Sequence, residues 1–352
     1  MDADQSAALR EQVSAAVESR TKLNISGAGS KSFYGRPVVG LTLDVTEHRG
    51  ITNYMPTELV ITARCGTPLM DIEQQLAKNR QMLAFEPPHF GPATLGGCIA
   101  SGLSGPRRPF SGAARDFVLG ARVINGEGQI LKFGAEVFKN VAGFDAARLM
   151  AGALGTLGVL LEVSLKVLPK PAEETTVVLE LDAAQAVTAA NDFAARPLPI
   201  SATAYDGSCL YIRLSGTAAA VSAARERIGG TELPLQSEWW RSVRDQTHPY
   251  FTATDPLWRL SLPAATPPLP IVGQWFYEWH GAQRWLKTAL PLKIIRETAA
   301  RAGGHATLFR NGQRDGNVFH PLPEPLKEIH KRLKRAFDPY SIFNPGRLYP
   351  DI

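Results

Sequence analysis

A run of small residues sets the tightest limit on what this chain can fold into. The stretch from Thr94 to Gly105 has the sequence TLGGCIASGLSG, and nearly every side chain in it is small. Such a segment lets a large anionic ligand lie directly against the backbone, where N–H groups and short hydroxyls can contact it. A tightly packed helix crossing would instead show periodic apolar residues, and this stretch has few. We therefore predict a ligand cradle between residues 94 and 105.

A second glycine-rich segment lies upstream, at residues 26–30. Glycines in such a segment allow a tight turn that points N–H groups toward phosphate oxygens. A Rossmann-type dinucleotide loop must open a helix, whereas here Gly35, Pro37 and Gly40 follow, so we expect no helix. Taken alone, the segment favours an ordinary turn. A third segment, residues 152–159, is expected to join a helix to a strand, and in isolation simple packing explains its glycines equally well.

Composition excludes several classes of protein. The chain has 352 residues, 44% of them hydrophobic and 20% charged, so we expect two domains or one large domain with an appendage. The net charge of +5 is mild and suits an anionic cofactor and substrate without nucleic acid. The three cysteines are far apart, which argues against disulfides, zinc and iron–sulfur clusters on this chain. We find no signal-peptide pattern and no apolar run long enough to span a bilayer, and expect a cytoplasmic protein.

The hydrophobic periodicity predicts mixed helices and strands. In the first half we expect helices over residues 3–20, 68–78 and 146–154, and strands over 23–25, 38–45, 59–63, 117–124, 129–133 and 157–168. In the second half we expect strands over 175–181, 209–214, 258–262 and 271–279, and helices over 183–195, 218–227, 293–302 and 323–335. The prolines at residues 169 and 171 interrupt the pattern, and β-α-β units follow, so we place a domain boundary here. Arg107 and Arg115 are expected in a solvated turn or in exposed ion pairs.

Six segments, taken together and in order, resemble those of the PCMH-type FAD-binding flavoproteins, the vanillyl-alcohol-oxidase superfamily. They are Gly27–Ser30, Arg64–Leu69, Ala93–Gly97, Gly112–Gly120, Lys139–Asp145 and Gly155–Val159, and they span roughly residues 23–168. The resemblance implies an α+β fold with a two-subdomain PCMH-type FAD-binding domain over residues 1–170. A small α/β cap domain with an antiparallel sheet would follow over 171–322. A C-terminal helix and tail, 323–352, would return to the FAD domain.

The resemblance also implies FAD as the cofactor. The expected FAD contacts are Gly27, Ala28, Gly29, Ser30, Thr94, Gly96, Gly97, Ser101, Gly102, Ser111, Gly155, Val159 and Asn344. Relatives that bind flavin covalently often carry a histidine in the first loop. Here that loop runs from Gly27 to Lys31 without one, and His89 lies outside it, so we expect non-covalent FAD.

The whole chain most resembles the small FAD-binding subunits of bacterial glycolate oxidases, through residues 303–310 and the tail 337–347. That resemblance implies oxidation of glycolate, a 2-hydroxy acid, to glyoxylate. It further implies a larger flavin subunit and an iron–sulfur subunit as partners, and peripheral membrane association through them. The larger relatives carry two histidines in a stretch that corresponds to residues 312–320. Because this chain begins it with Gly312 and keeps only His320, we expect no paired-histidine metal or substrate site.

Oxidation of a 2-hydroxy acid requires a base for the hydroxyl proton and cations for the carboxylate. His320 is the candidate base, with His305 second, although a structural hydrogen bond explains either histidine equally well. Arg310 and Arg314 are the candidate carboxylate clamps, with Arg347 as a further candidate that more simply caps the end of the chain. The six tryptophans, all after residue 238, suggest a core or a subunit interface.

Three functions remain open at this point. The chain is the flavin subunit of an oxidoreductase complex, a stand-alone flavin-dependent 2-hydroxy-acid dehydrogenase, or a structural flavin subunit that has lost turnover. The lack of a cysteine cluster favours the first, because electrons must leave for a redox centre elsewhere.

Overall fold

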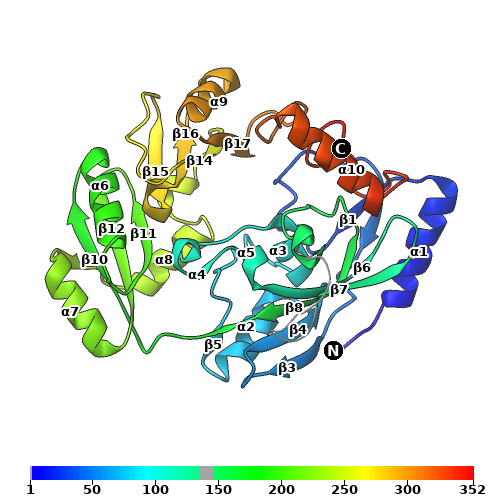
Figure 1. Cartoon of the computed structure of the whole chain (residues 1–352), viewed down its shortest axis with the longest axis horizontal. Coiled ribbons are helices and arrows are strands. Elements are labelled where there is room, and N and C mark those ends of the chain that lie inside the picture. The colour runs from blue at the N-terminus through cyan, green and yellow to red at the C-terminus, as the bar shows by residue number, and fades with distance from the viewer. Residues whose placement is uncertain (1, 135–145) are drawn as a thin grey trace. The chain divides into compact units, whose positions relative to one another are not determined.

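The structure is a computed structural model that describes residues 2–134 and 146–352. The segment Lys139–Asp145, one of the six that carry the family resemblance, lies outside the described residues. Contacts divide the chain into two compact units (Figure 1). The first comprises Met1–Leu103, Ala113–Pro169 and Arg314–Ile352, and the second Ser104–Gly112 and Lys170–Gln313. These units differ from the expected domains in two places, because residues 104–112 pack with the second unit and residues 314–322 with the first.

The described residues of the first unit form three sheets. Strands β1 (Leu23–Ser26) and β2 (Leu41–Asp44) form a parallel pair, and β5 (Gln81–Met82) pairs with β9 (Leu168–Pro169). The third sheet is antiparallel and has the order β3 (Ile51–Met55), β4 (Val60–Arg64), β8 (Val159–Lys166), β6 (Val118–Ile124), β7 (Ile130–Gly134). The helices are α1 (Ser6–Ser19), α2 (Leu69–Ala77), α3 (Leu95–Ser101), α5 (Ala114–Phe117), α10 (Glu324–Phe337) and the 3₁₀ turn η1 (Ala146–Met150).

The first half of strand β8, residues 159–161, is buried on both faces, which explains why these three residues in a row are apolar. Val159 and Leu161 belong to the core beneath α1, whereas Leu160 belongs to the core beneath α2 and α3. The helix that we expected over residues 146–154 is reduced to η1, because the chain then turns through left-handed backbone at Gly152 and Leu154.

The second unit is built on one eight-stranded antiparallel sheet. Its order is β13 (Thr231–Glu232), β10 (Glu173–Glu180), β12 (Cys209–Gly216), β11 (Ile200–Tyr205), β15 (Gln274–Glu278), β16 (Gln283–Lys287), β14 (Leu257–Ser261), β17 (His305–Arg310). Its helices are α4 (Arg108–Ser111), α6 (Ala183–Ala194), α7 (Ala218–Ile228), α8 (Gln236–Arg244), α9 (Leu292–Arg301) and the 3₁₀ turns η2 (Pro249–Phe251) and η3 (Trp279–Gly281). The antiparallel sheet was expected, but β11, β16, β17 and α8 were not.

Residues 104–112 are tied firmly into the second unit. Arg107, which we expected in a solvated turn, is only 7% exposed, and its Nη2 donates to Glu174 Oε1 at 2.7 Å. The indole Nε1 of Trp279 donates to the carbonyl of Gly105 at 3.1 Å. The burial of Arg107 corrects the sequence expectation, since an ion pair of this kind requires a partner that sequence spacing does not reveal. Arg115 is exposed and lies 3.7 Å from Asp116, as expected.

Most of the tryptophans contribute to the core of the second unit. Trp240, Trp258, Trp279 and Trp285 are buried there, with Trp285 against Phe309 at a centroid distance of 4.8 Å. Of the two explanations open from the sequence, the core therefore accounts for these four. The described part of the chain contains no helix that is both long and apolar enough to cross a membrane.

Candidate cofactor site

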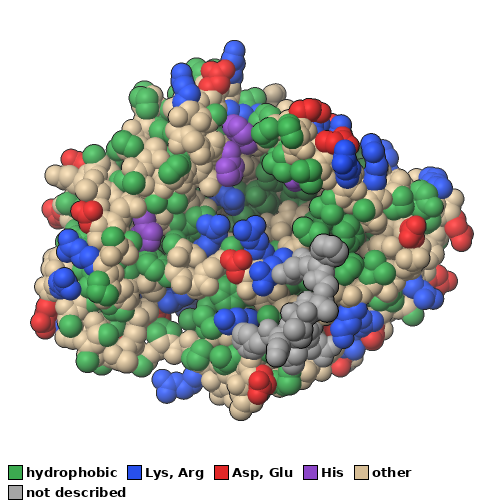
Figure 2. Space-filling view, viewed as in Figure 1, with side chains coloured by type: hydrophobic (Ala, Val, Ile, Leu, Met, Phe, Trp, Pro, Cys, Tyr) green, Lys and Arg blue, Asp and Glu red, His purple; other side chains and the backbone are tan. Residues whose placement is uncertain are grey.

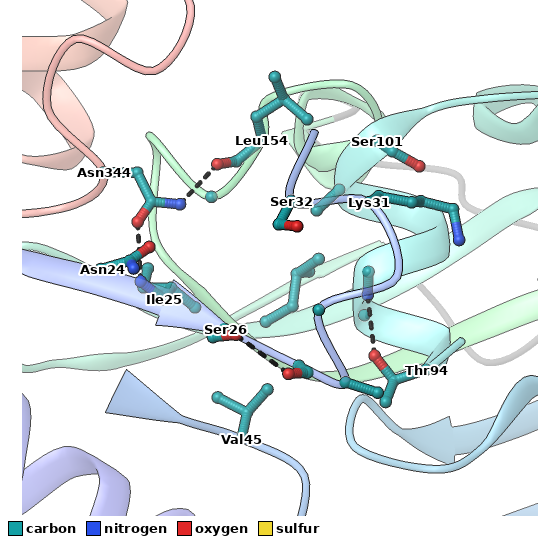
Figure 3. A pocket seen from close by; sticks show the side chains of 18 of the residues that line it. Asn24, Ile25, Ser26, Lys31, Ser32, Val45, Thr94, Ser101, Leu154 and Asn344 are labelled. Carbon is teal, nitrogen blue, oxygen red and sulfur yellow. Dashed lines mark hydrogen bonds between the residues drawn. The ribbon is translucent and has the colours of Figure 1, made fainter. Parts of the chain in front are cut away.

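A pocket with about 940 Å³ of empty space, partly open to solvent, lies within the first unit (Figure 3). Its walls come from β1, from the loop after β1, from α3, from the turn between η1 and β8, and from the C-terminal tail. It is lined by Asn24, Ile25, Ser26, Gly27, Ala28, Gly29, Ser30, Lys31, Ser32, Val45, Thr94, Gly96, Gly97, Ala100, Ser101, Leu154, Gly155, Gly158, Leu160, Asn344 and Arg347. This described lining carries two basic side chains and no acidic one, so it favours an anionic ligand.

The loop at residues 27–30 supplies unused hydrogen-bond donors. Its N–H groups donate to no other group within the described part of the chain. Gly29 has a φ of +74°, and a Cβ added there would meet nothing within 4 Å, so its position faces open space. At Gly27 a Cβ would lie 2.5 Å from Thr94 Oγ1, so a side chain cannot fit. This arrangement of small residues and free N–H groups fits a diphosphate. The segment that looked like an ordinary turn in the sequence is therefore the main source of donors.

Helix α3 forms another wall and corrects part of our expectation for the run of small residues. Five residues of the run line the pocket, but Leu95–Ser101 form a packed helix. Its first N–H groups are already used: Leu95 N donates to the carbonyl of Thr67 at 2.9 Å and Gly96 N to that of Cys65 at 2.8 Å. Leu95 and Ile99, four residues apart, pack into the core. This helical spacing was present in the sequence and was overlooked because the residues between them are small.

The two adjacent glycines of α3 have different surroundings. A Cβ at Gly96 would lie 2.9 Å from Cys65 Cβ, so although Gly96 borders the pocket its missing side chain allows close packing with the core. A Cβ at Gly97 would meet only Thr94 Oγ1, at 3.3 Å. Thr94 caps the helix by accepting a hydrogen bond from Gly97 N, also at 3.3 Å. The face formed by Gly97, Ala100 and Ser101 thus offers the pocket a surface of small side chains.

The turn between η1 and β8 meets the C-terminal tail at one asparagine (Figure 3). Asn344 Oδ1 accepts from Ile25 N at 2.7 Å, and its Nδ2 donates to the carbonyl of Leu154 at 2.7 Å. A Cβ at Gly155 would lie 2.6 Å from Asn344 Nδ2, so only glycine leaves room for this contact. Arg347 lines the same pocket, where burial lowers its pKa.

Ten of the thirteen expected FAD contacts line the pocket. Gly102, Ser111 and Val159 do not: Gly102 ends α3 against Gly152, Ser111 lies in the second unit, and Val159 points into the core beneath α1. Sequence reasoning missed Asn24, Ile25, Lys31, Ser32, Val45 and Leu160 as lining residues, and it treated Arg347 as a substrate clamp or chain cap. Ser26, Ala100, Leu154 and Gly158 lie within the three segments singled out in the sequence but were not named as FAD contacts. Contact of any of them with FAD itself stays a prediction.

The three candidate catalytic residues are not among the residues that line this pocket. His320 is half-buried in the first unit, and its carbonyl accepts from Tyr349 Oη at 3.3 Å. Arg314, also in the first unit, donates from Nε to the carbonyl of Gly35 at 3.0 Å, and burial together with the charge of Arg347 lowers its pKa to about 10. Arg310 ends β17 in the second unit, where burial lowers its pKa. Their catalytic roles stay predictions.

The fold and the pocket define a PCMH-type FAD-binding flavoprotein. A family model described as an FAD binding domain matches residues 2–134. A solved structure of alkyldihydroxyacetonephosphate synthase matches 96% of this chain and 74% of its own, with a TM-score of 0.68 at 16% identity, which supports the fold alone.

Relatives in the curated proteins narrow the class further. Glycolate oxidase subunit GlcE of Escherichia coli (strain K12) is 50% identical over 352 residues, which is 100% of this chain and 99% of that protein. The chain therefore belongs to the GlcE family and, like that family, is an FAD-binding protein. Glycolate oxidase subunit GlcD of Bacillus subtilis (strain 168) is 30% identical over 176 residues, 49% of this chain and 37% of that protein. D-lactate dehydrogenase of Anaerostipes hadrus is 32% identical over a similar share.

Proposed function

We propose that this chain is the FAD-binding subunit of a complex that oxidises glycolate to glyoxylate and passes the electrons to a partner redox subunit. The observation that carries the proposal is 50% identity over the whole chain to a glycolate oxidase subunit. The pocket supports it, because a basic lining with free N–H donors suits the diphosphate of FAD.

FAD supplies a hydride acceptor for the carbon that bears the hydroxyl group. The protein binds the cofactor through residues 27–30 and the small-residue face of α3. In our proposal His320 accepts the hydroxyl proton of the substrate. Arg314 holds its carboxylate, with Arg310 as the other candidate for this role, because a planar guanidinium is the best-matched partner. His320 and Arg314 are not among the residues that line the described cofactor pocket, so in this proposal the substrate meets them outside that lining.

We propose a larger flavin subunit and an iron–sulfur subunit as the partners. This chain has three cysteines, one fewer than a four-thiolate cluster requires, and Cys65 and Cys98 are buried. Burial raises the pKa of Cys98 to about 12, which disfavours the thiolate that ligates iron. Onward electron transfer therefore falls to another chain. We place the complex in the cytoplasm, with any membrane contact made through the partners.

We also propose that FAD is held without a covalent bond. The described pocket lining contains no histidine, cysteine or tyrosine side chain that could form one. His89 lies elsewhere, with its Nε2 3.1 Å from Glu73 Oε2. Acid precipitation of the purified chain should release the yellow colour into the supernatant. Colour that stays in the pellet would contradict this proposal.

Two alternative functions make different predictions: a stand-alone 2-hydroxy-acid dehydrogenase and a structural flavin subunit without turnover. The decisive experiment mixes the isolated chain, and then the reconstituted complex, with glycolate in the absence of oxygen while flavin absorbance is followed. Bleaching of both flavins in the complex, that of this chain and that of the larger subunit, supports the proposed function. Rapid bleaching of the isolated chain favours the stand-alone enzyme. If the flavin of this chain stays oxidised in both, its role is structural.

A further inference from the structure

The residues that follow α10 touch three walls of the cofactor pocket. We call residues 342–347 the C-terminal strap. On the first wall, Leu23 N donates to the carbonyl of Ile342 at 2.7 Å, and Asn344 N donates to that of Leu23 at 3.0 Å. Leu23 also forms an isolated parallel bridge with Phe343, so the strap lies beside β1. Ile25 N, which donates to Asn344 Oδ1, completes this contact.

The other two walls are the turn after η1 and the loop after β1. Asn344 Nδ2 holds the turn through the carbonyl of Leu154. Arg347 holds the loop, since its Nη1 donates to the carbonyl of Arg36 at 2.9 Å and its Nη2 to that of Ser32 at 3.0 Å. Arg36 returns a bond from Nε to the carbonyl of Gly346 at 2.9 Å. The strap thus connects segments far apart in the sequence, all of which border the pocket.

A buried ion pair anchors the strap. Lys334 is 4% exposed and Asp338 is fully buried. Lys334 Nζ donates to Asp338 Oδ2 at 2.7 Å, to the carbonyl of Phe343 at 2.8 Å and to that of Thr156 at 2.7 Å, which uses all three of its protons. Asp338 accepts in turn from Ile342 N at 3.1 Å and Phe343 N at 2.8 Å.

These hydrogen bonds link the Lys334–Asp338 pair to segments outside α10. Burying two charges is costly, and only excellent geometry with further hydrogen bonds offsets that cost. Here the further bonds go to the first residues of the strap and to Thr156, the neighbour of the pocket residue Gly155. The partners of the pair are therefore placed where they fix the strap against the pocket wall.

We propose that Lys334 and Asp338 are positioning residues for FAD, acting by holding the C-terminal strap closed over three walls of the pocket. FAD binds the strapped pocket in preference to the unstrapped one, so cofactor binding and strap docking are coupled and each stabilises the other. The inference rests on FAD binding alone and does not depend on glycolate chemistry.

The test removes both charges together, since one charge left alone in the core would endanger folding. The variant combines Lys334→Met with Asp338→Asn in the full chain. The matched control combines Glu328→Gln with Arg332→Met, an exposed pair at the same four-residue spacing on α10. In Figure 2, basic and acidic side chains lie side by side over this helix. Titration of each apoprotein with FAD, followed by flavin fluorescence, gives the dissociation constants.

We expect the dissociation constant for FAD to rise at least tenfold in the Lys334–Asp338 variant and to change less than twofold in the control. Hydrogen exchange provides a readout that a merely structural pair would not move. In the wild type, added FAD should slow exchange of the amides of Leu23, Ile25 and Asn344, and in the variant this slowing should be lost. A lower melting temperature of the apoprotein with normal FAD affinity and normal FAD-dependent protection would overturn the proposal.

Two milder variants keep the test decisive if the double variant does not fold. Asn344→Ala removes the bonds to Ile25 and Leu154, and Arg347→Ala removes those to Arg36 and Ser32. A wild-type dissociation constant in both would overturn the strap proposal. If the wild-type chain itself did not bind FAD, the assignment of FAD as the cofactor would be wrong. That outcome is distinct from failure of the strap proposal.

Discussion

Neighbouring glycines in this protein serve different purposes, and their substitution should have different consequences. Valine at Gly29 or Gly97 would project into the pocket, because a Cβ at either position meets open space or only Thr94 Oγ1. We expect Gly97→Val to be soluble and folded but colourless, since the side chain takes space that the cofactor needs. Gly29→Val should lose the flavin as well, but valine there also strains the backbone, whose φ is +74°. The measurement is the ratio of flavin to protein absorbance, with circular dichroism as the test of folding. Normal flavin content in both folded variants would contradict the assignment of the cradle.

Gly96 provides the matched comparison. A Cβ there would lie 2.9 Å from Cys65 Cβ in the core. We expect Gly96→Val to cost about 1–3 kcal/mol of stability through overpacking. Its primary effect should be a lower melting temperature of the apoprotein, which Gly97→Val should not share. Equal melting temperatures for the two variants would show that it is wrong to assign Gly96 to the core side of α3 and Gly97 to its pocket side.

At the scale of single residues, much of the cofactor pocket could be predicted from the sequence. Gly97 was identifiable from the run of small residues, whereas Gly27 and Gly29 were named through the family resemblance, because their segment taken alone favours an ordinary turn. Lys31 and Val45 were missed for a different reason. They line the pocket because the backbone places them there, and nothing in their residue types or spacing indicates it.

The turn η3 makes one element sensitive to pH. His280 has left-handed backbone with a φ of 56°, its Nδ1 lies 3.2 Å from Thr203 Oγ1, and its ring lies against Phe110. Burial lowers the pKa of His280 to about 4. Because the folded pKa lies below the ordinary value of 6.5, the second unit should lose stability as pH falls from about 6.5 toward 4. The loss should be about 2 kcal/mol, after allowance for partial exposure.

Tryptophan fluorescence can measure this effect in the second unit alone, because all six tryptophans lie after residue 238 and before residue 286. Urea midpoints are compared at pH 7 and pH 4.5. His280→Asn removes the titrating group and keeps a residue that tolerates left-handed backbone. It should reduce the pH dependence but not abolish it, since burial also lowers the pKa of His248 in the same unit. A variant with undiminished pH dependence would exclude His280 as a cause.

At the scale of elements, strands rich in apolar residues could be predicted from the sequence more readily than strands of small and hydroxylated residues. The central strand β8 was recognisable from its long apolar run. Strand β11, Ile200–Tyr205, was missed although it is wholly buried, because its small and hydroxylated residues lack a clear period. Its Thr203 hydroxyl bonds to His280, a partner 77 residues away that the local sequence cannot indicate. Helix α3 was missed because its glycines disguised the spacing of Leu95 and Ile99.

At the scale of the whole molecule, each compact unit combines segments that are distant in sequence. The boundary near Pro169 could be predicted, because prolines interrupt the pattern of strands there. The assignment of residues 104–112 to the second unit could not, because it depends on Arg107 meeting Glu174 and on Trp279 meeting Gly105. Those bonds join positions 67 and 174 residues apart.

The last prediction concerns the division of labour between this chain and its proposed partners. We expect the isolated chain to turn over glycolate poorly or not at all. His320 is the single histidine in residues 312–320, and it does not line the described cofactor pocket. The three cysteines cannot supply a four-thiolate cluster for onward electron transfer. Both observations favour a subunit that needs partners to complete its chemistry.

The competing expectation is an autonomous enzyme in which His320 and an arginine suffice. Steady-state oxidation of glycolate with an artificial dye acceptor, by the isolated chain and by the reconstituted complex, distinguishes the two. We expect turnover by the complex to exceed that of the isolated chain at least tenfold. His320→Ala should reduce the rate of the complex if this histidine acts as the base. Comparable turnover by the isolated chain, abolished by His320→Ala, would show that the chain is a complete enzyme and that its partners only accept electrons.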